Sequence, residues 1–85
     1  MIMVIFGEMI VPAGGYGPRC SDPDSHAGDG ALYCVDGPVT VNLVDAQESF
    51  VLEPEDTFFL PAGTKYQLVN FENKPVKVVF AITEL

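Results

Sequence analysis

Residues 55–70 read EDTFFLPAGTKYQLVN, and this stretch decides the fold class. Aromatic and aliphatic residues occupy two short runs, and Pro61-Ala62-Gly63 lies between them. Such runs separated by Pro and Gly are typical of short β-strands on either side of a tight turn. The stretch therefore predicts strands at Thr57–Leu60 and Tyr66–Phe71, joined as a hairpin that turns the side chains of the second strand toward the interior.

Short apolar runs separated by turn residues continue along the rest of the chain. Val39, Val41 and Leu43 alternate with polar residues, as in a half-buried strand. The turns are too short to hold crossover helices, so we expect an antiparallel, all-β sandwich or barrel of one domain over residues 1–85. Residues 12–30 are rich in Gly, Pro, Ser and Asp and predict an irregular loop. The other predicted strands are Met1–Phe6, Met9–Val11 (after a break at Gly7-Glu8), Ala31–Val35, Val39–Val44, Ser49–Leu52 and Val76–Ile82.

The apolar content is high for so short a chain. Hydrophobic residues make up 48% of the 85 residues, and a domain of this size buries only about 60–65% of its unfolded surface. Surplus apolar side chains either fill a tight core or are buried against a second copy. Two runs are candidates for a homodimer contact, as exposed edge strands, with ordinary core as the alternative for each. They are Met1, Met3 and Ile5, and the last-strand residues Val76, Val78, Phe80 and Ile82.

The acidic balance of the chain argues against nucleic acid as a direct partner. Twelve acidic and four basic side chains give a formal net charge of −8, and the basic residues form no cluster. Binding to phosphates needs a basic surface, which this chain lacks. Met1–Phe6 is apolar but too short to span a membrane and lacks the flanking features of a signal peptide, so no membrane association is expected.

Residues 55–70 resemble the second conserved motif of the cupin superfamily. That motif runs Gly, five residues, Pro-x-Gly, two residues, a metal-binding His, three residues and Asn. Pro61, Gly63 and Asn70 are in register with it, while Glu55 stands at the first Gly and Tyr66 at the His. The resemblance implies a jelly-roll-like β-barrel.

The first cupin motif is matched only in part. Counting back from its final Gly, Gly37, places Asp24 and His26 at two His positions and Gly30 at a Glu position. Functional cupins hold a metal with three His and one Glu, and this chain has one histidine, so we expect no metal cofactor. The expected state of His26 is a solvated loop histidine, and the alternative is a weaker metal site formed by His26 with Asp24 and Asp29.

Cys20 and Cys34 match no ligand motif and are expected to be reduced thiols of an intracellular protein, a disulfide bridge being the alternative.

Within the cupins, the chain resembles the C-terminal domain of the centromere protein C (CENP-C) family. The resemblance rests on the segments 9–14, 33–41, 50–52, 58–70 and 78–80. It implies a non-catalytic homodimerisation and protein-docking domain of a kinetochore scaffold, located in the nucleus at the centromere. Two such domains would bring two scaffold chains together and raise the apparent affinity of the linked pair for their binding partners.

The barrel interior is the candidate docking pocket for a centromere or kinetochore protein or peptide. The alternative is that its aromatic rings only fill the barrel. The competing class is a metal-dependent cupin enzyme or a cupin that binds a small, sugar-type ligand. We expect no enzyme, because Lys77 and residues at strand ends are the only Asp, Glu, His, Lys or Arg residues in the predicted strands, so no acid–base pair is placed for proton transfer. The candidate pocket residues are Tyr33, Phe58, Tyr66, Leu68 and Asn70.

Overall fold

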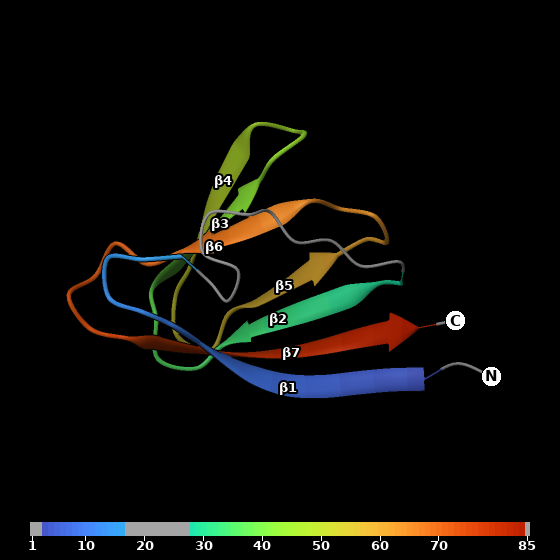
Figure 1. The fold of residues 1–85 in the computed structure, drawn as a ribbon, viewed down its shortest axis with the longest axis horizontal. Helices are drawn as coiled ribbons and strands as arrows, with labels where there is room; N and C mark the ends of the chain where they lie inside the picture. The colour runs from blue at the N-terminus through green and yellow to red at the C-terminus, as the bar shows by residue number, and fades with distance from the viewer. Residues whose placement is uncertain (1–2, 17–27, 85) are drawn as a thin grey trace.

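The fold consists of strands connected by turns. The computed structural model describes residues 3–16 and 28–84, and no helix occurs among them. The described part accordingly has no helix long and apolar enough to cross a membrane. The prediction of an all-β fold is confirmed. The strands are β1 (Met3–Val11), β2 (Gly30–Cys34), β3 (Val39–Leu43), β4 (Glu48–Leu52), β5 (Thr57–Leu60), β6 (Tyr66–Val69) and β7 (Val76–Glu84) (Figure 1).

The strands form two antiparallel sheets that lie one over the other (Figure 1). The larger sheet has the order β1-β7-β2-β5, and the smaller sheet has the order β4-β3-β6. Most connections pass from one sheet to the other, which is the arrangement of a jelly roll. At the free edge of β6, an isolated antiparallel bridge joins Val69 to Tyr16. Tyr16 belongs to the first part of the predicted loop, residues 12–16, which the structure describes.

Alternating side chains fill the space between the sheets. In β3, Val39 and Val41 are buried while Thr40 between them is partly exposed. This period of two follows from the pleat of a strand, which points successive side chains to opposite faces. Each fully buried aliphatic side chain contributes roughly 1.5–3 kcal/mol. The core comprises Val11, Leu32, Cys34, Val39, Val41, Leu52, Leu60, Tyr66, Leu68, Val76 and Val78.

The first strand is continuous, and the predicted break at Gly7-Glu8 is wrong. Gly7 lies in the middle of β1 and pairs with Phe80 of β7. A Cβ added at Gly7 would overlap the Cζ atom of the Phe80 ring. Glycine at this position therefore makes room for a neighbouring ring and does not end the strand.

The last strand is not an edge strand, which corrects the candidate homodimer contact. β7 lies between β1 and β2. Val76 and Val78 are fully buried and Ile82 is buried, while Phe80 packs against the core, so these side chains are not available to a second copy. Met3 and Ile5 lie on β1, which is an edge strand, and both are exposed. Met1 lies outside the described residues.

The Pro61-Ala62-Gly63 turn joins the two sheets and does not form the expected hairpin. The strand before it, β5, pairs with β2, and the strand after it, β6, pairs with β3. The backbone N–H of Thr64 donates to the carbonyl oxygen of Pro61 across the turn, and Gly63 has a φ of 78°. The turn therefore carries the chain across the barrel edge, and it brings Tyr66 and Leu68 into the core as predicted.

Glu55 occupies a backbone conformation that favours glycine. Its φ is 76°, in the left-handed region, where a side chain costs roughly 1–2 kcal/mol. This explains why the motif that residues 55–70 resemble has glycine there.

Replacing Glu55 with glycine is expected to raise the free energy of unfolding by about 0.5–1 kcal/mol, because the relief of strain exceeds the entropy that glycine adds to the unfolded chain. Urea denaturation of the Glu55→Gly variant measures this. As a control, Glu53→Gly removes the same side chain from a position without a positive φ and is expected to destabilise. Equal destabilisation of both variants would contradict the account.

Candidate functional site

The predicted pocket residues divide between the interior and the surface. Tyr66 and Leu68 are buried in the core, and Phe58 is partly buried against it, so these three lie inside the barrel. Tyr33 is exposed, because it alternates with the buried Leu32 and Cys34 and therefore points outward. The prediction that Tyr33 lines the pocket is wrong for this reason.

Asn70 is buried, but its side chain is occupied by the backbone. Its Nδ2 donates to the carbonyl oxygens of Val11 (3.1 Å) and Lys74 (2.7 Å). Its Oδ1 accepts from the backbone N–H of Glu72 (2.8 Å). These bonds join the end of β1 to the turn between β6 and β7. Asn70 is therefore a structural residue, and its prediction as a pocket residue is wrong.

A pair of aromatic rings lies where the edge strands of the two sheets meet. Phe50 of β4 and Phe58 of β5 have ring centroids 5.4 Å apart. Phe50 pairs with the inward-facing Val41, so it faces the interior, yet 40% of its surface is exposed. Leu43, on the same face of β3, packs against the core and is partly exposed. We call Leu43, Phe50 and Phe58 the barrel mouth.

The sequence analysis missed Phe50 and Leu43 as candidate site residues. The available signal was the phase of the predicted strand, since Phe50 and Leu52 are two residues apart and share a face. That the inward-facing Phe50 remains accessible to solvent could not be read from the sequence, because it depends on the position of β4 at the edge of its sheet.

Among the described residues, Cys34 is a free cysteine, and it lies in the core. The side chain is fully buried, and burial raises the pKa of the thiol. A backbone hydrogen bond at Gly37 lowers this pKa, and the nearby carboxylates of Asp36, Asp56 and Glu53 raise it further. The thiol is thus protonated at neutral pH, and a buried thiol is a poor nucleophile. Cys34 acts as a core residue.

The described residues do not fit the metal that functional cupins hold. They contain no group of three or more His, Cys, Asp or Glu side chains that could hold a metal ion. The motif's third His and its Glu correspond to the buried Tyr66 and to Gly30. Asp29 Oδ1 accepts a hydrogen bond from the backbone N–H of Ala62 (2.9 Å). Asp24, His26 and Cys20 lie outside the described residues, and the absence of a metal cofactor stays a prediction.

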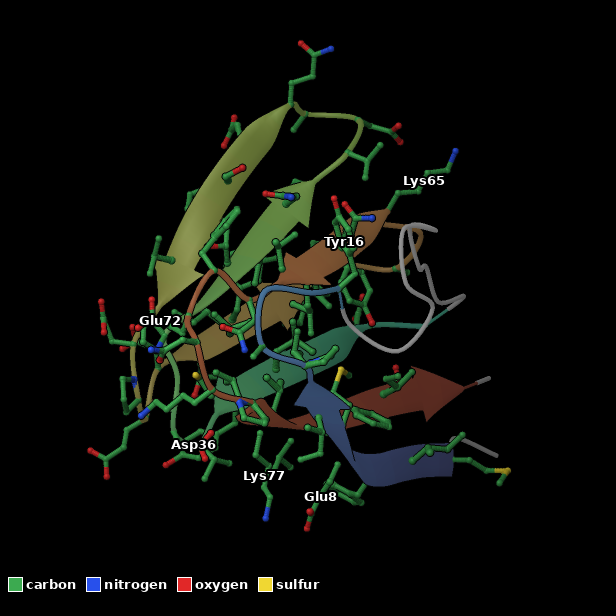
Figure 2. The ribbon with its side chains drawn as sticks, turned by 60° about the vertical axis from the view of Figure 1, so that its left-hand side comes forward. Glu8, Tyr16, Asp36, Lys65, Glu72 and Lys77 are labelled. Atoms are coloured by element: carbon green, nitrogen blue, oxygen red, sulfur yellow. The ribbon has the colours of Figure 1, made fainter. Side chains whose placement is uncertain are left out.

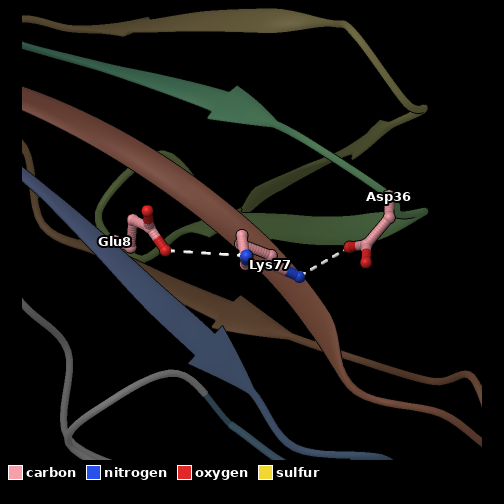
Figure 3. A network of polar contacts seen from close by, with 3 residues as sticks. All are labelled: Glu8, Asp36 and Lys77. Atoms are coloured by element: carbon pink, nitrogen blue, oxygen red, sulfur yellow. Dashed lines mark hydrogen bonds and ion pairs between the residues drawn. The ribbon is translucent and has the colours of Figure 1, made fainter.

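An acidic and a basic side chain on the outward positions of β1 and β7 form an ion pair between the two neighbouring strands. Figure 2 shows Glu8 and Lys77 pointing away from the smaller sheet, and the Lys77 Nζ atom lies 3.7 Å from Glu8 Oε2. The backbone N–H of Lys77 donates to Asp36 Oδ1 (2.6 Å) (Figure 3). Both side chains of the ion pair are substantially exposed, so its contribution to stability is small.

The fold and the sequence together establish the family. The family described as "Cupin domain" matches residues 7–82, which include β2 to β6 entirely and most of β7. This chain is a cupin. No curated protein matches its sequence.

Solved structures of similar shape include two enzymes. The polyketide cyclase RemF from Streptomyces resistomycificus is 18% identical, with a TM-score of 0.78 over 94% of this cupin and 54% of that chain. The DMSP lyase DddQ from Ruegeria pomeroyi is 17% identical, with a TM-score of 0.79 over 95% of this cupin and 38% of that chain. A cupin domain from Bordetella pertussis is 17% identical, with a TM-score of 0.74 over 96% of this cupin and 82% of that chain.

These comparisons correct two predictions. The prediction that this cupin is not an enzyme is corrected, because a polyketide cyclase and a DMSP lyase share its fold and a non-catalytic role therefore has no support. Nothing in the comparisons links the chain to the centromere protein C family, whose motifs overlap those of cupins in general. This cupin spans about half the length of RemF, and at these identities the similarity shows the fold alone.

Proposed function

We propose that this cupin binds a small, apolar, ring-containing molecule at the barrel mouth, as a ligand or as a substrate. One observation carries the proposal: the ring of Phe50 faces the interior but is 40% exposed, and it lies 5.4 Å from the ring of Phe58 on the other sheet. Small-molecule sites in proteins are concave and mostly apolar, with few polar groups. Two inward-facing rings at the junction of two sheets, one of them substantially open to solvent, supply the apolar lining that such a site needs.

The chemistry of the mouth indicates the class of molecule. Its three side chains carry no charge and no hydrogen-bonding group, so a sugar would leave its hydroxyl groups unpaired there. An apolar, ring-containing molecule matches this lining better than a polyhydroxylated ligand does.

The enzyme of similar fold that acts on polyketides supports the same class. A polyketide cyclase shares the backbone of this cupin, and a carbon skeleton of that type is compatible with an apolar, aromatic mouth. The kinetochore docking role and its nuclear location remain predictions that no comparison supports.

Titration of 2-naphthol into the purified protein by isothermal calorimetry tests the proposal. We expect saturable binding that the Phe50→Ser variant weakens by about tenfold or more, because the removed ring supplies the stacking surface. Val51→Ser is the matched control, since Val51 is the next residue along β4, is exposed and faces outward. Absence of saturable binding, or equal weakening by both substitutions, would overturn the proposal.

A further inference from the structure

One edge of the smaller sheet, along β4, is open to another chain. β4 pairs with β3 on one side, and no described strand pairs with it on the other (Figure 1). In an antiparallel pair, every second residue directs its backbone N–H and C=O away from the partner strand. Among the described residues, no backbone hydrogen bond reaches these outward groups of β4. Such a row of donors and acceptors is a template for an extended chain.

β4 also lacks the features that usually protect a sheet edge. Glu48–Leu52 contains no proline and no lysine, and its register with β3 is continuous, without a bulge. Proline, lysine or a bulge at an exposed edge commonly prevents pairing with another chain. The opposite edge of the same sheet is partly covered, because Val69 bridges Tyr16 and the backbone N–H of Asn70 donates to the carbonyl oxygen of Gly15. β4 is therefore the open edge of the smaller sheet.

The charge around β4 indicates which chain would pair with it. Residues 45–56 contain five acidic side chains, all exposed, and no Lys or Arg occurs between residues 20 and 64. If two copies paired along this edge, the acidic turn at one end of β4 would meet the acidic turn at the other end of the second strand, and like charges repel. The charge therefore disfavours a second copy and favours a basic chain. The five residues are Asp45, Glu48, Glu53, Glu55 and Asp56.

We propose that the free edge of β4 binds an extended, basic peptide segment of another protein, which adds to the smaller sheet as a further strand. In strand addition, backbone hydrogen bonds provide the affinity, and alternate side chains provide the specificity. Lys or Arg at both ends of the peptide would pair with the acidic side chains at both ends of β4. The middle of the peptide would lie beside Phe50 and Val51, which are 40% and 57% exposed, so β-branched residues fit there.

Fluorescence anisotropy of the labelled peptide acetyl-KKVTVTVKK-amide, titrated with the whole chain, tests the proposal. We expect saturable binding that weakens as the salt concentration rises, because the charges involved are exposed. The control peptide acetyl-KKVTPTVKK-amide has the same charge, but its proline removes an N–H and disfavours a continuous strand. It should bind about tenfold more weakly or worse. Equal binding of the two peptides would show that charge alone holds them and would overturn the proposal.

Two charge reversals in the protein locate the site. Glu48→Lys reverses a charge on β4 and is expected to weaken binding of the first peptide by about threefold or more. Glu8→Lys is the matched control, because it makes the same change at an exposed residue of β1, the edge strand of the larger sheet. It should change the affinity by less than about twofold. Equal weakening by both substitutions would overturn the proposal.

Amide hydrogen exchange identifies the strand that the peptide pairs with. With acetyl-KKVTVTVKK-amide bound, exchange should slow within Glu48–Leu52, because the outward N–H groups of β4 gain acceptors, and it should stay unchanged in Met3–Val11. Protection confined to β1 or β5 would overturn the proposal, as would the absence of saturable binding up to about 1 mM protein.

Discussion

Replacing Asn70 with alanine is expected to lower the free energy of unfolding by about 2–4 kcal/mol. The side chain is fully buried and makes three hydrogen bonds to the backbone. Its loss leaves the carbonyl oxygens of Val11 and Lys74 and the N–H of Glu72 without their partner, and each buried unpaired group costs about 1–3 kcal/mol. For a domain of this size, each 1 kcal/mol corresponds to a fall in Tm of about 4–8 °C. Thermal unfolding followed by circular dichroism measures the effect.

Asn73 provides the control for the Asn70 prediction. It lies in the same turn but is exposed, so Asn73→Ala is expected to change stability by less than about 0.5 kcal/mol. Asn70→Asp is a sharper variant, because it keeps the acceptor for Glu72 but turns a carboxylate toward two carbonyl oxygens. It should destabilise at pH 7 at least as much as alanine does. A loss below about 1 kcal/mol for Asn70→Ala would show that the backbone groups find other partners.

Replacing Gly7 with alanine is expected to destabilise the fold by about 1–3 kcal/mol, although alanine is ordinarily better than glycine in a strand. The added methyl group would overlap the ring of Phe80, which packs against the core. The ring must therefore leave its position or the strands must separate locally. Urea denaturation of the variant and the wild type gives the difference in unfolding free energy.

A double-mutant cycle isolates the cause of the Gly7 effect. In the Phe80→Leu background the ring is gone, so Gly7→Ala should become neutral or stabilising, because alanine loses less backbone entropy on folding. If Gly7→Ala costs the same in both backgrounds, the overlap with Phe80 is not the reason for glycine at this position.

The strands were predictable from sequence where their side chains alternate or where Pro and Gly bound them. Thr57–Leu60 was predicted with its observed bounds, and the strand starting at Val39 differs by one residue at its end. The predicted break at Gly7 was wrong because a glycine that ends a strand and a glycine that accommodates a ring look the same in sequence. Only the pairing of Gly7 with Phe80 distinguishes the two.

The sequence by itself determined the fold class, the cupin superfamily and the inward direction of Tyr66 and Leu68, because the turn chemistry of Pro and Gly and the two-residue period of strands are local properties. Only the tertiary structure decided that β7 lies between two other strands, that Tyr33 points outward and that Phe50 remains open to solvent. Which strands become neighbours depends on contacts between residues far apart in the chain, such as Phe6 with Ala81 and Ala31 with Phe59.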